Sequence, residues 1–366
     1  MTDPTGARQK VAILGGGLVG RLLAWRLAQD NGITKAKHIH VFEKGSLYPS
    51  LSQTDKAAAF TAAAMISPLS ELVSSEAEIY QLGKKSLELW PLWLGQLGCP
   101  QYFHQQGSLV LAHVNDQAEL HQFQRDLDYK LAQLATSPNH NQYYHIIQGQ
   151  QQLKALEADI GTHFQRGLWL KDEAHIDHHP VLEQLVEQGQ ALGINFHQHQ
   201  PVNVNDPVLA SFNLIFDCRG LGSKSINQNG LRGVRGEVIH LESKEITLTR
   251  PIRLMHPRYK LYIVPKPNHR FIIGATEIES EDTSAISLRS SMELMSALYA
   301  INPAFAEARI LAQDCNLRPA YLDNLPKITG SLSNQNQAII SINGLYRHGY
   351  LIAPALIEQA LQKAFL

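Results

Sequence analysis

A glycine cluster directly after a short apolar run constrains the fold of this chain more than any other feature. Val11 to Leu14 is predicted to be a buried strand, and the next residues place Gly15, Gly17 and Gly20 in the spacing G-x-G-x-x-G. In a strand–turn–helix unit these glycines permit a tight turn, a close approach of backbone to a pyrophosphate, and close packing of helix on strand. The helix predicted from Leu18 to Gln29 offers free N–H groups and a positive dipole end to phosphates.

An acidic residue follows at the distance that such a site requires. The second predicted strand, His38 to Phe42, ends just before Glu43, about 20 residues after the glycines, where a carboxylate can accept from ribose hydroxyls. This spacing predicts a βαβ unit that opens a doubly wound sheet and binds a dinucleotide, although such glycines can also serve only a tight turn. The fingerprint alone does not separate NAD from FAD.

Composition excludes several classes of protein. The 366 residues fit two domains, and 32 Lys and Arg against 33 Asp and Glu give no field that would attract nucleic acid or a membrane. Cys99, Cys218 and Cys315 are too few and too scattered for a disulfide framework, which indicates a reducing compartment. The polar leader is no signal peptide, and the apolar stretch 56–69 is too short to span a bilayer. We therefore expect a soluble, cytoplasmic protein.

Hydrophobic periodicity predicts the order of the remaining elements. Helices are predicted over 86–97, 116–134, 180–193, 287–300 and from about Pro354, and strands over 107–114, 213–218, several parts of 233–276, and 338–342. The polar stretch 138–149 is predicted to be a surface connection. Nucleotide-type elements at the start, the middle and the end predict a discontinuous nucleotide-binding domain interrupted by a substrate domain.

Three segments resemble the family of FAD-dependent glycine oxidases and D-amino acid oxidases. They are TAAAMISPLSE (61–71), LYIVPKPNHRFIIGATEIES (261–280), and NLRPAYLDNLPKITG with NGLYRHGYLIAPAL (316–330 and 343–356). The similarity keeps the family's order and is weakest over 101–195. It implies an α/β fold with a discontinuous Rossmann-type FAD-binding domain (1–90, 150–228 and 325–366). The second domain, α+β on a mainly antiparallel sheet, would comprise 91–149 and 229–324.

The resemblance implies FAD, bound non-covalently. The pyrophosphate would contact Gly15, Gly17, Leu18, Val19 and Gly20, and the ribose would contact Glu43, beside Lys44. The segment Thr61, Ala62, Ala63, Ala64 and Met65 would pass beside the flavin, unless it only begins an alanine-rich helix. Val202 would contact adenine, although a plain buried valine fits equally. Further contacts are implied for Gly220, Gly222, Gly344, Tyr346, Arg347, Gly349, Tyr350 and Leu351.

Two neighbours of these motifs have no assigned cofactor role. Arg219 stands where many family members carry a small residue, and we expect it to form a surface salt bridge. Cys315 lies close to the position where some relatives attach flavin, but strand alternation would turn its thiol to the opposite face.

For the substrate, the resemblance implies Arg318 and Tyr262 near the flavin, with Arg347 close to the ring. A guanidinium holds a carboxylate through two parallel bonds, and a phenol adds a third. His348 and Lys260 lie near these motifs without matching a family position. The implied reaction is hydride transfer from the amine-bearing carbon to flavin N5, hydrolysis of the imine, and reoxidation by O2 to hydrogen peroxide.

Two histidine clusters have spacings that suggest metal ligands. They are HIDHH, with His175, His178 and His179, and HQHQ, with His197 and His199. No cysteine or paired carboxylate completes either set, so we expect solvated loop histidines and no metal.

Two functions remain open at this point. One is oxidation of glycine or a similar free amino acid, with the imine feeding thiazole synthesis for thiamine. The other is modification of a precursor protein, in which a flavoprotein of this fold helps to build the tryptophylquinone cofactor of an amino acid oxidase. The region 101–195 and Arg219 would show the difference. A tRNA-modifying flavoenzyme is disfavoured because the chain has no basic patch.

Overall fold

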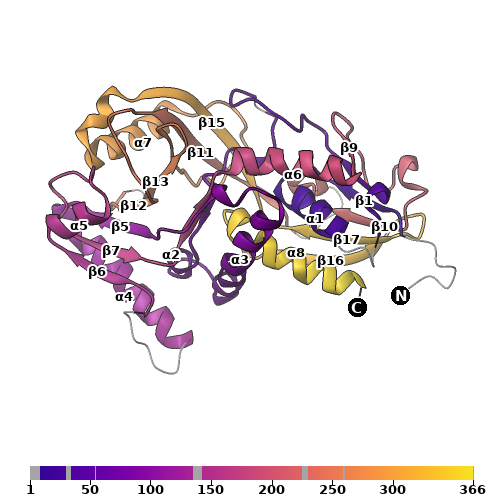
Figure 1. Ribbon diagram of the computed structural model, residues 1–366, viewed down its shortest axis with the longest axis horizontal. Helices are drawn as coiled ribbons and strands as arrows, with labels where there is room; N and C mark the ends of the chain where they lie inside the picture. Colours follow the sequence, from indigo (N-terminus) through magenta and orange to yellow (C-terminus); the bar gives the residue numbers. More distant parts are fainter. Residues whose placement is uncertain are drawn as a thin grey trace.

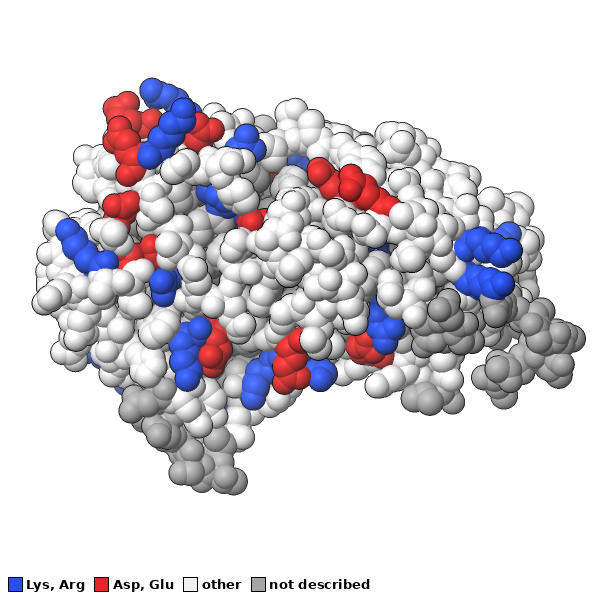
Figure 2. Space-filling model, in the orientation of Figure 1, with Lys and Arg blue, Asp and Glu red and all other residues white. Residues whose placement is uncertain are grey.

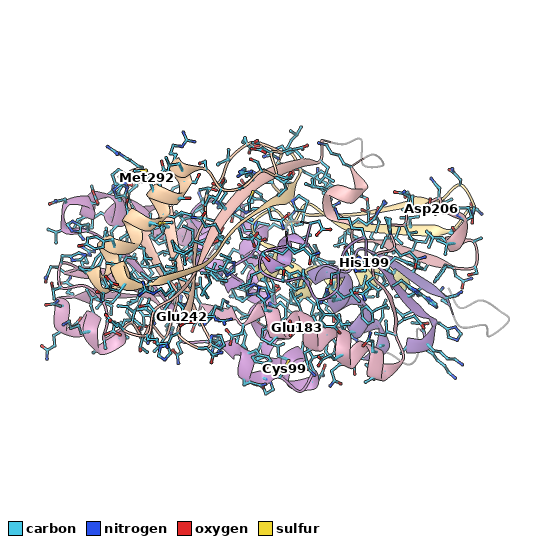
Figure 3. All side chains as sticks on the ribbon, turned by 90° about the horizontal axis from the view of Figure 1, so that it is seen from above. Cys99, Glu183, His199, Asp206, Glu242 and Met292 are labelled. Atoms are coloured by element: carbon cyan, nitrogen blue, oxygen red, sulfur yellow. The ribbon has the colours of Figure 1, made fainter. Side chains whose placement is uncertain are left out.

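Two large sheets lie side by side along the long axis of the molecule (Figure 1). The computed structural model describes residues 9–29, 34–53, 55–134, 142–224, 230–258 and 260–365. Residues 1–8 of the predicted polar leader and residues 138–141 of the predicted connection lie outside these residues. Seen from above, Met292 and Asp206 mark opposite ends of the molecule (Figure 3).

The six-stranded sheet joins segments that are far apart in the sequence. Its order is β16-β17-β10-β1-β2-β9, and neighbouring strands are parallel except at the antiparallel edge pair of β16 and β17. The predicted discontinuous Rossmann-type sheet is therefore confirmed. The strands are β1 (Val11–Leu14), β2 (Ile39–Phe42), β9 (Asn195–His197), β10 (Leu214–Asp217), β16 (Lys327–Leu332) and β17 (Ala338–Asn343).

Helices bury one face of this sheet, and an irregular segment containing Val202 and Phe212 covers the other. The alternating inward residues of β1, Val11 and Ile13, pack against the helices, while Ala12 and Leu14 face the irregular segment. The helices are α1 (Leu18–Gln29), α3 (Ala77–Gln96), α6 (His178–Leu192) and α8 (Gly349–Phe365).

The last helix begins at Gly349, and not near Pro354 as predicted. Proline removes a backbone donor, so a carbonyl one turn earlier loses its helical partner. Here the carbonyl of Tyr350 accepts instead from Trp90 Nε1 at 2.8 Å. The side chain of Trp90 on α3 thus supplies the hydrogen bond that the backbone of Pro354 cannot, and the helix continues through the proline.

The eight-stranded sheet is antiparallel except where β5 runs parallel to β12, as expected for the second domain. Helix α7 (Leu288–Ile301) packs on one face, and α4 (Gln117–Leu134) covers β5. In order, the strands are β15 (Arg309–Ala320), β11 (Arg232–Glu242), β14 (Arg270–Gly274), β13 (Lys260–Lys266), β12 (Ile252–Met255), β5 (Ser108–Ala112), β7 (Arg166–Leu170) and β6 (His145–Gln148).

Two parts of this sheet differ from expectation. The stretch 138–149 contains β6, an edge strand of only four residues (HIIQ) within an otherwise polar segment, so the segment as a whole resembles a loop. β7 pairs with β5 in this sheet, whereas the predicted domain boundary at residue 150 placed β7 in the FAD-binding domain. Pairing between strands that are far apart in the sequence leaves no local sequence signal. The domain boundaries otherwise stay a prediction.

A small third sheet connects the two halves. It consists of β3 (Met65–Ile66), β8 (Ala174–Ile176) and β4 (Phe103–His104). The alanine-rich segment before it forms a short 3₁₀ turn, Ala58–Phe60, and then β3, so the alternative of a helix start is wrong. Two short helices, α2 (Pro68–Leu72) and α5 (Gln150–Leu156), complete the fold.

Surface and thiol features agree with the composition. Acidic and basic side chains alternate over the face shown in Figure 2, without a patch of one sign. All three cysteines are free. Within the described residues, no helix has both the length and the apolar character needed to cross a bilayer. The cytoplasmic location stays a prediction.

Candidate functional site

A cavity of about 1710 Å³ extends from the turn after β1 to the strands β11, β13 and β15. It is lined by every predicted cofactor and substrate residue except Gly20 and Gly344. Segments that are separate in the sequence therefore meet around one space, as the resemblance implied. The volume exceeds that of an ordinary small-molecule pocket, so it can hold a dinucleotide together with a substrate.

The three fingerprint glycines differ in what surrounds them. Gly15 has φ +96°, and a β-carbon on it would lie 2.7 Å from the carbonyl oxygen of Cys218. A β-carbon on Gly20 would overlap the carbonyl oxygen of Gly15, so the helix packs against the turn itself. Gly17 faces open space, with Ala57 3.5 Å away. The turn therefore leaves room for a phosphate at the second glycine, which fits a pyrophosphate.

Glu43 lies beside this turn with its carboxylate already held in place. Gly16 N donates to Oε2 at 2.6 Å, and Gly45 N donates to Oε1 at 2.9 Å. Each oxygen keeps a further lone pair, so the group can still accept from a ribose diol. Lys44 lines the cavity next to it.

Arg219 forms an ion pair, but not at the surface as predicted. Its guanidinium binds Asp217 in a bidentate manner, with both bonds at 2.8 Å, and the side chains are only 11% and 2% exposed. Nη1 also donates to the Val202 carbonyl and to Asn203 Oδ1. The pair fastens the end of β10 to the segment around Val202, at the cavity wall where adenine is predicted to lie.

A buried ion pair fixes the segment that is predicted to pass beside the flavin. Lys56 and Asp314 lie 2.9 Å apart, with side chains 1% and 6% exposed. Thr61 Oγ1 donates to the same carboxylate at 2.9 Å, and Asn316 donates to the Lys56 carbonyl at 3.0 Å. The segment is thus tied to β15, which also carries Arg318. No local motif marks Lys56 or Asp314, because the contact joins residues over 200 positions apart.

The C-terminal return closes the other side of the cavity. Gly344 has φ +76°, and a β-carbon there would overlap the ring of Tyr321. Tyr346 N donates to the Pro319 carbonyl at 2.9 Å, which holds the turn against β15. The first turn of α8, from Gly349, lines the cavity, and its unpaired N–H groups suit an electron-rich ring edge. These features fit FAD.

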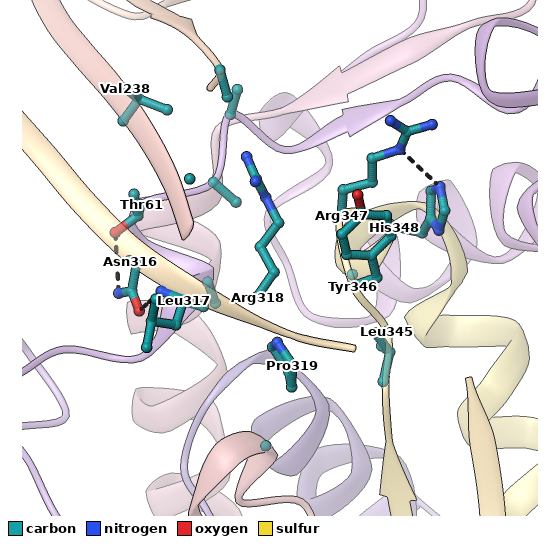
Figure 4. A pocket seen from close by; sticks show the side chains of 18 of the residues that line it. Thr61, Val238, Asn316, Leu317, Arg318, Pro319, Leu345, Tyr346, Arg347 and His348 are labelled. Atoms are coloured by element: carbon teal, nitrogen blue, oxygen red, sulfur yellow. Dashed lines mark hydrogen bonds between the residues drawn. The ribbon is translucent and has the colours of Figure 1, made fainter. Parts of the chain in front are cut away.

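Arg318 projects from β15 into the cavity between the flavin segment and the C-terminal return (Figure 4). Its Nη1 donates to the carbonyls of Thr276 and Arg235 at 3.0 and 3.3 Å. Across the described part of the chain, no carboxylate lies within 4.0 Å of this guanidinium, and its Nε and Nη2 have no protein acceptor. The guanidinium of Arg318 therefore has carbonyl acceptors but no carboxylate partner among the described residues.

Arg347 has a different environment. It pairs with Glu71 Oε2 and Glu277 Oε2, both at 3.0 Å. Glu71 also contacts Arg253 at 2.9 Å and His348 at 3.1 Å. Burial alone would raise the pKa of Glu71, but Arg347, His348 and Arg253 lower it well below the ordinary value. The sequence indicated neither Glu71 nor Arg253, because their contact spans 182 positions.

Tyr262 lies on the same cavity wall as Arg318. Burial raises the pKa of its phenol, which therefore stays protonated and able to donate. The side chain of Lys260 lies outside the described residues. Cys315 does not line the cavity, as predicted for its thiol, although Asn316, Leu317 and Arg318, which follow it on the same strand, do.

The histidines of HIDHH are not solvated loop residues, contrary to expectation. His175 and His178 are 4% and 1% exposed, because β8 is the central strand between β3 and β4, and the start of α6 packs against Phe60 and Tyr350. In the second cluster His197 stacks on Phe42, while His199 is exposed as expected.

Comparisons with known proteins agree in family and fold. The sequence model of the DAO family, described as FAD dependent oxidoreductase, matches residues 10–360. A putative thiamine biosynthesis oxidoreductase ThiO from Rhizobium etli is 33% identical, over 97% of this chain and 96% of that protein. The glycine oxidase of Bacillus subtilis is 23% identical, over 94% and 90%. The crystal structure of glycine oxidase from Bacillus cereus superposes with a TM-score of 0.76 at 19% identity, over 96% of each chain. From its first strand to its last helix, this chain belongs to the DAO family of FAD-dependent oxidoreductases.

Proposed function

We propose that this protein oxidises the C–N bond of glycine or another small amino acid, with FAD as cofactor and O2 as the final acceptor. The observation that carries the proposal is the unpaired guanidinium of Arg318 inside the cavity. Among the other arginines that line the cavity, Arg219, Arg253 and Arg347 each pair with a carboxylate. The remaining two, Arg258 and Arg289, are exposed to solvent. A substrate carboxylate would supply the anion that Arg318 lacks.

Two side chains would orient the substrate. Arg318 would hold the carboxylate through Nε and Nη2, which have no partner among the described residues. The protonated phenol of Tyr262 would donate to the same carboxylate. Together they would direct the amine-bearing carbon towards the flavin, and this orientation is the main contribution that the protein makes to the rate. No side chain is needed as a general base, and His348 is occupied by Glu71.

The bound flavin supplies the two-electron acceptor for hydride transfer and the reaction with O2 that yields hydrogen peroxide. We propose that Gly15, Gly17 and the start of α1 bind its pyrophosphate, and that Glu43 binds the ribose. The segment 61–65 and the C-terminal return would enclose the ring without a covalent bond. Water would then hydrolyse the released imine.

The names of the relatives support this substrate class. One is called a glycine oxidase and another a putative thiamine biosynthesis oxidoreductase, so a supply of oxidised glycine for thiamine synthesis is part of the proposal. Within the described residues no feature specifically favours the alternative of a precursor protein as substrate.

The test is peroxide release by the purified yellow protein. Glycine, sarcosine and D-alanine would be supplied in turn, with glycolate as a matched acid that lacks the amine. We expect turnover of at least one amino acid and none of glycolate, and we expect glycolate to compete. An intact flavin that is silent with all amino acids would overturn the proposal and would direct attention to a protein substrate.

A further inference from the structure

A second cluster of ligand-type side chains lies outside the cavity, on the three-stranded sheet. His104 on β4 is the cross-strand partner of His175 on β8, and Asp177 directly follows β8. One ligand atom from each lies within 4.8 Å of the other two. We propose that these three side chains bind a divalent first-row transition-metal ion, with Zn²⁺ as the most suitable.

Only small side-chain movements are needed to form this site. His104 Nε2 and Asp177 Oδ2 are 2.7 Å apart, and the two imidazole rings stack with centroids 4.8 Å apart. Zinc binds nitrogen and oxygen at about 2.0–2.2 Å, so two ligand atoms of a tetrahedral site lie about 3.4 Å apart. The farthest pair of ligand atoms would approach by about 1.4 Å, and His104 Nε2 and Asp177 Oδ2, now at hydrogen-bond distance, would separate by about 0.7 Å. The side chain of His104 is 36% exposed and has room to turn.

Two of the three side chains are buried, and one of them leaves a polar atom unused. His175 and Asp177 are 4% and 3% exposed. Asp177 Oδ1 is buried without a hydrogen-bond partner among the described residues. Buried polar atoms without partners are costly and rare in folded proteins. A bound cation would satisfy the carboxylate and one nitrogen of each ring.

The ligand set identifies the kind of ion. Two imidazoles and one carboxylate suit zinc and its neighbours, whereas Mg²⁺ and Ca²⁺ prefer oxygen ligands alone. The exposed side of His104 leaves a position for water as the fourth ligand. One charge opposes binding: Lys266 Nζ donates to the Ile176 carbonyl, between the two buried ligands. We therefore expect weaker binding than at a four-ligand structural zinc site.

Such an ion would act as a clamp near the flavin. His175 lies opposite Met65 in the sheet, and Ile176 N donates to the Ala64 carbonyl at 3.0 Å. Joining β4 to β8 would therefore also steady the segment predicted to pass beside the ring. The clamp does not depend on which substrate the cavity takes.

The test is zinc binding by the tag-free holoprotein after treatment with a chelator. Calorimetric titration with Zn²⁺ should give one ion per chain and, near 100-fold excess over Kd, a rise in Tm of a few degrees. His104→Gln and Asp177→Asn should each lower the affinity more than about tenfold. His269→Asn, at an exposed turn histidine, is the matched control and should change nothing. Mg²⁺ should not bind.

Equal flavin content and an unchanged far-UV spectrum would show that each variant is folded. Absence of saturable zinc binding by the wild type would overturn the proposal. Equal affinity in His104→Gln and the control would also overturn it, because the ion would then bind elsewhere. Neither result depends on the substrate panel, so the two proposals fail separately.

Discussion

The guanidinium of Arg318 on β15 lies against Gly236 on β11, in the space that a β-carbon at residue 236 would occupy. Gly274 has a similar relation to Tyr262, since a β-carbon there would lie 3.0 Å from the phenol oxygen. Both proposed substrate-binding side chains therefore rest on glycines of neighbouring strands. The positions of Arg318 and Tyr262 therefore depend on the absence of a β-carbon at Gly236 and Gly274.

Gly236→Ala should displace Arg318 while leaving the sheet intact. Overpacking of this kind costs about 1–3 kcal/mol, and the loss of that much binding free energy corresponds to a rise of about 5- to 150-fold in KM for the amino acid. Gly330→Ala on β16 is the control, because a β-carbon there meets nothing within 4 Å. Steady-state kinetics of both variants provide the measurement. An unchanged KM in Gly236→Ala would show that Arg318 does not hold the substrate in this position.

Arg318→Ala should retain FAD and lose about 2–5 kcal/mol in kcat/KM, because the substrate carboxylate would be left without its partner. Arg318→Lys should recover only part of the loss, since an ammonium cannot form two parallel bonds. Arg309→Ala, at an exposed arginine on the same strand, should have no effect. Flavin absorbance and peroxide kinetics separate binding of the cofactor from binding of the substrate.

Glu71→Gln should destabilise the protein by about 3 kcal/mol at pH 7, because the partly buried guanidinium groups of Arg253 and Arg347 lose their shared anion. The pKa of Glu71 is lowered in the folded state. The Glu71 carboxylate therefore contributes fully to the free energy of unfolding above pH 4.5, the ordinary pKa of a glutamate. This contribution is lost as the pH falls below 4.5 and the carboxylate becomes protonated. Denaturant unfolding at pH 7 and below pH 4.5 should show the difference between wild type and variant shrinking.

The control for this prediction is Glu88→Gln, because Glu88 is 64% exposed and pairs only with Lys85. An exposed pair contributes at most about 1 kcal/mol. Equal stability of the two variants at pH 7 would mean that Glu71 does not neutralise the arginines.

Gly20→Ala should abolish FAD binding, because the new methyl group would overlap the Gly15 carbonyl and force α1 away from the turn. The purified variant should be colourless, with a low ratio of 450 nm to 280 nm absorbance. Gly95→Ala, where a β-carbon meets nothing within 4 Å, should stay yellow. Full flavin content in Gly20→Ala would contradict the proposed pyrophosphate site.

Local sequence patterns predicted those parts of the fold in which neighbouring residues determine the structure. The unit from Val11 to Phe42 and the helices α4, α6 and α7 agree closely with their hydrophobic periodicity. The predicted element boundaries were wrong where a contact with a distant residue outweighs the local sequence pattern. Pro354 lies inside α8 because Trp90 donates to the carbonyl that the proline frees, and β6 is a short edge strand that pairs with the distant β7.

The sequence by itself determined the nucleotide turn, because the glycine spacing encodes it locally. Its resemblance to a known family supplied the cofactor class and the candidates Arg318 and Tyr262. Only the tertiary structure decided the charge state of the site. Whether an arginine is free, as Arg318 is, or paired, as Arg347 is with Glu71, depends on side chains from distant strands and helices. The same holds for His104 and Asp177, which meet only when β4 pairs with β8. Charge interactions act over a few ångströms in space, whatever the separation along the chain.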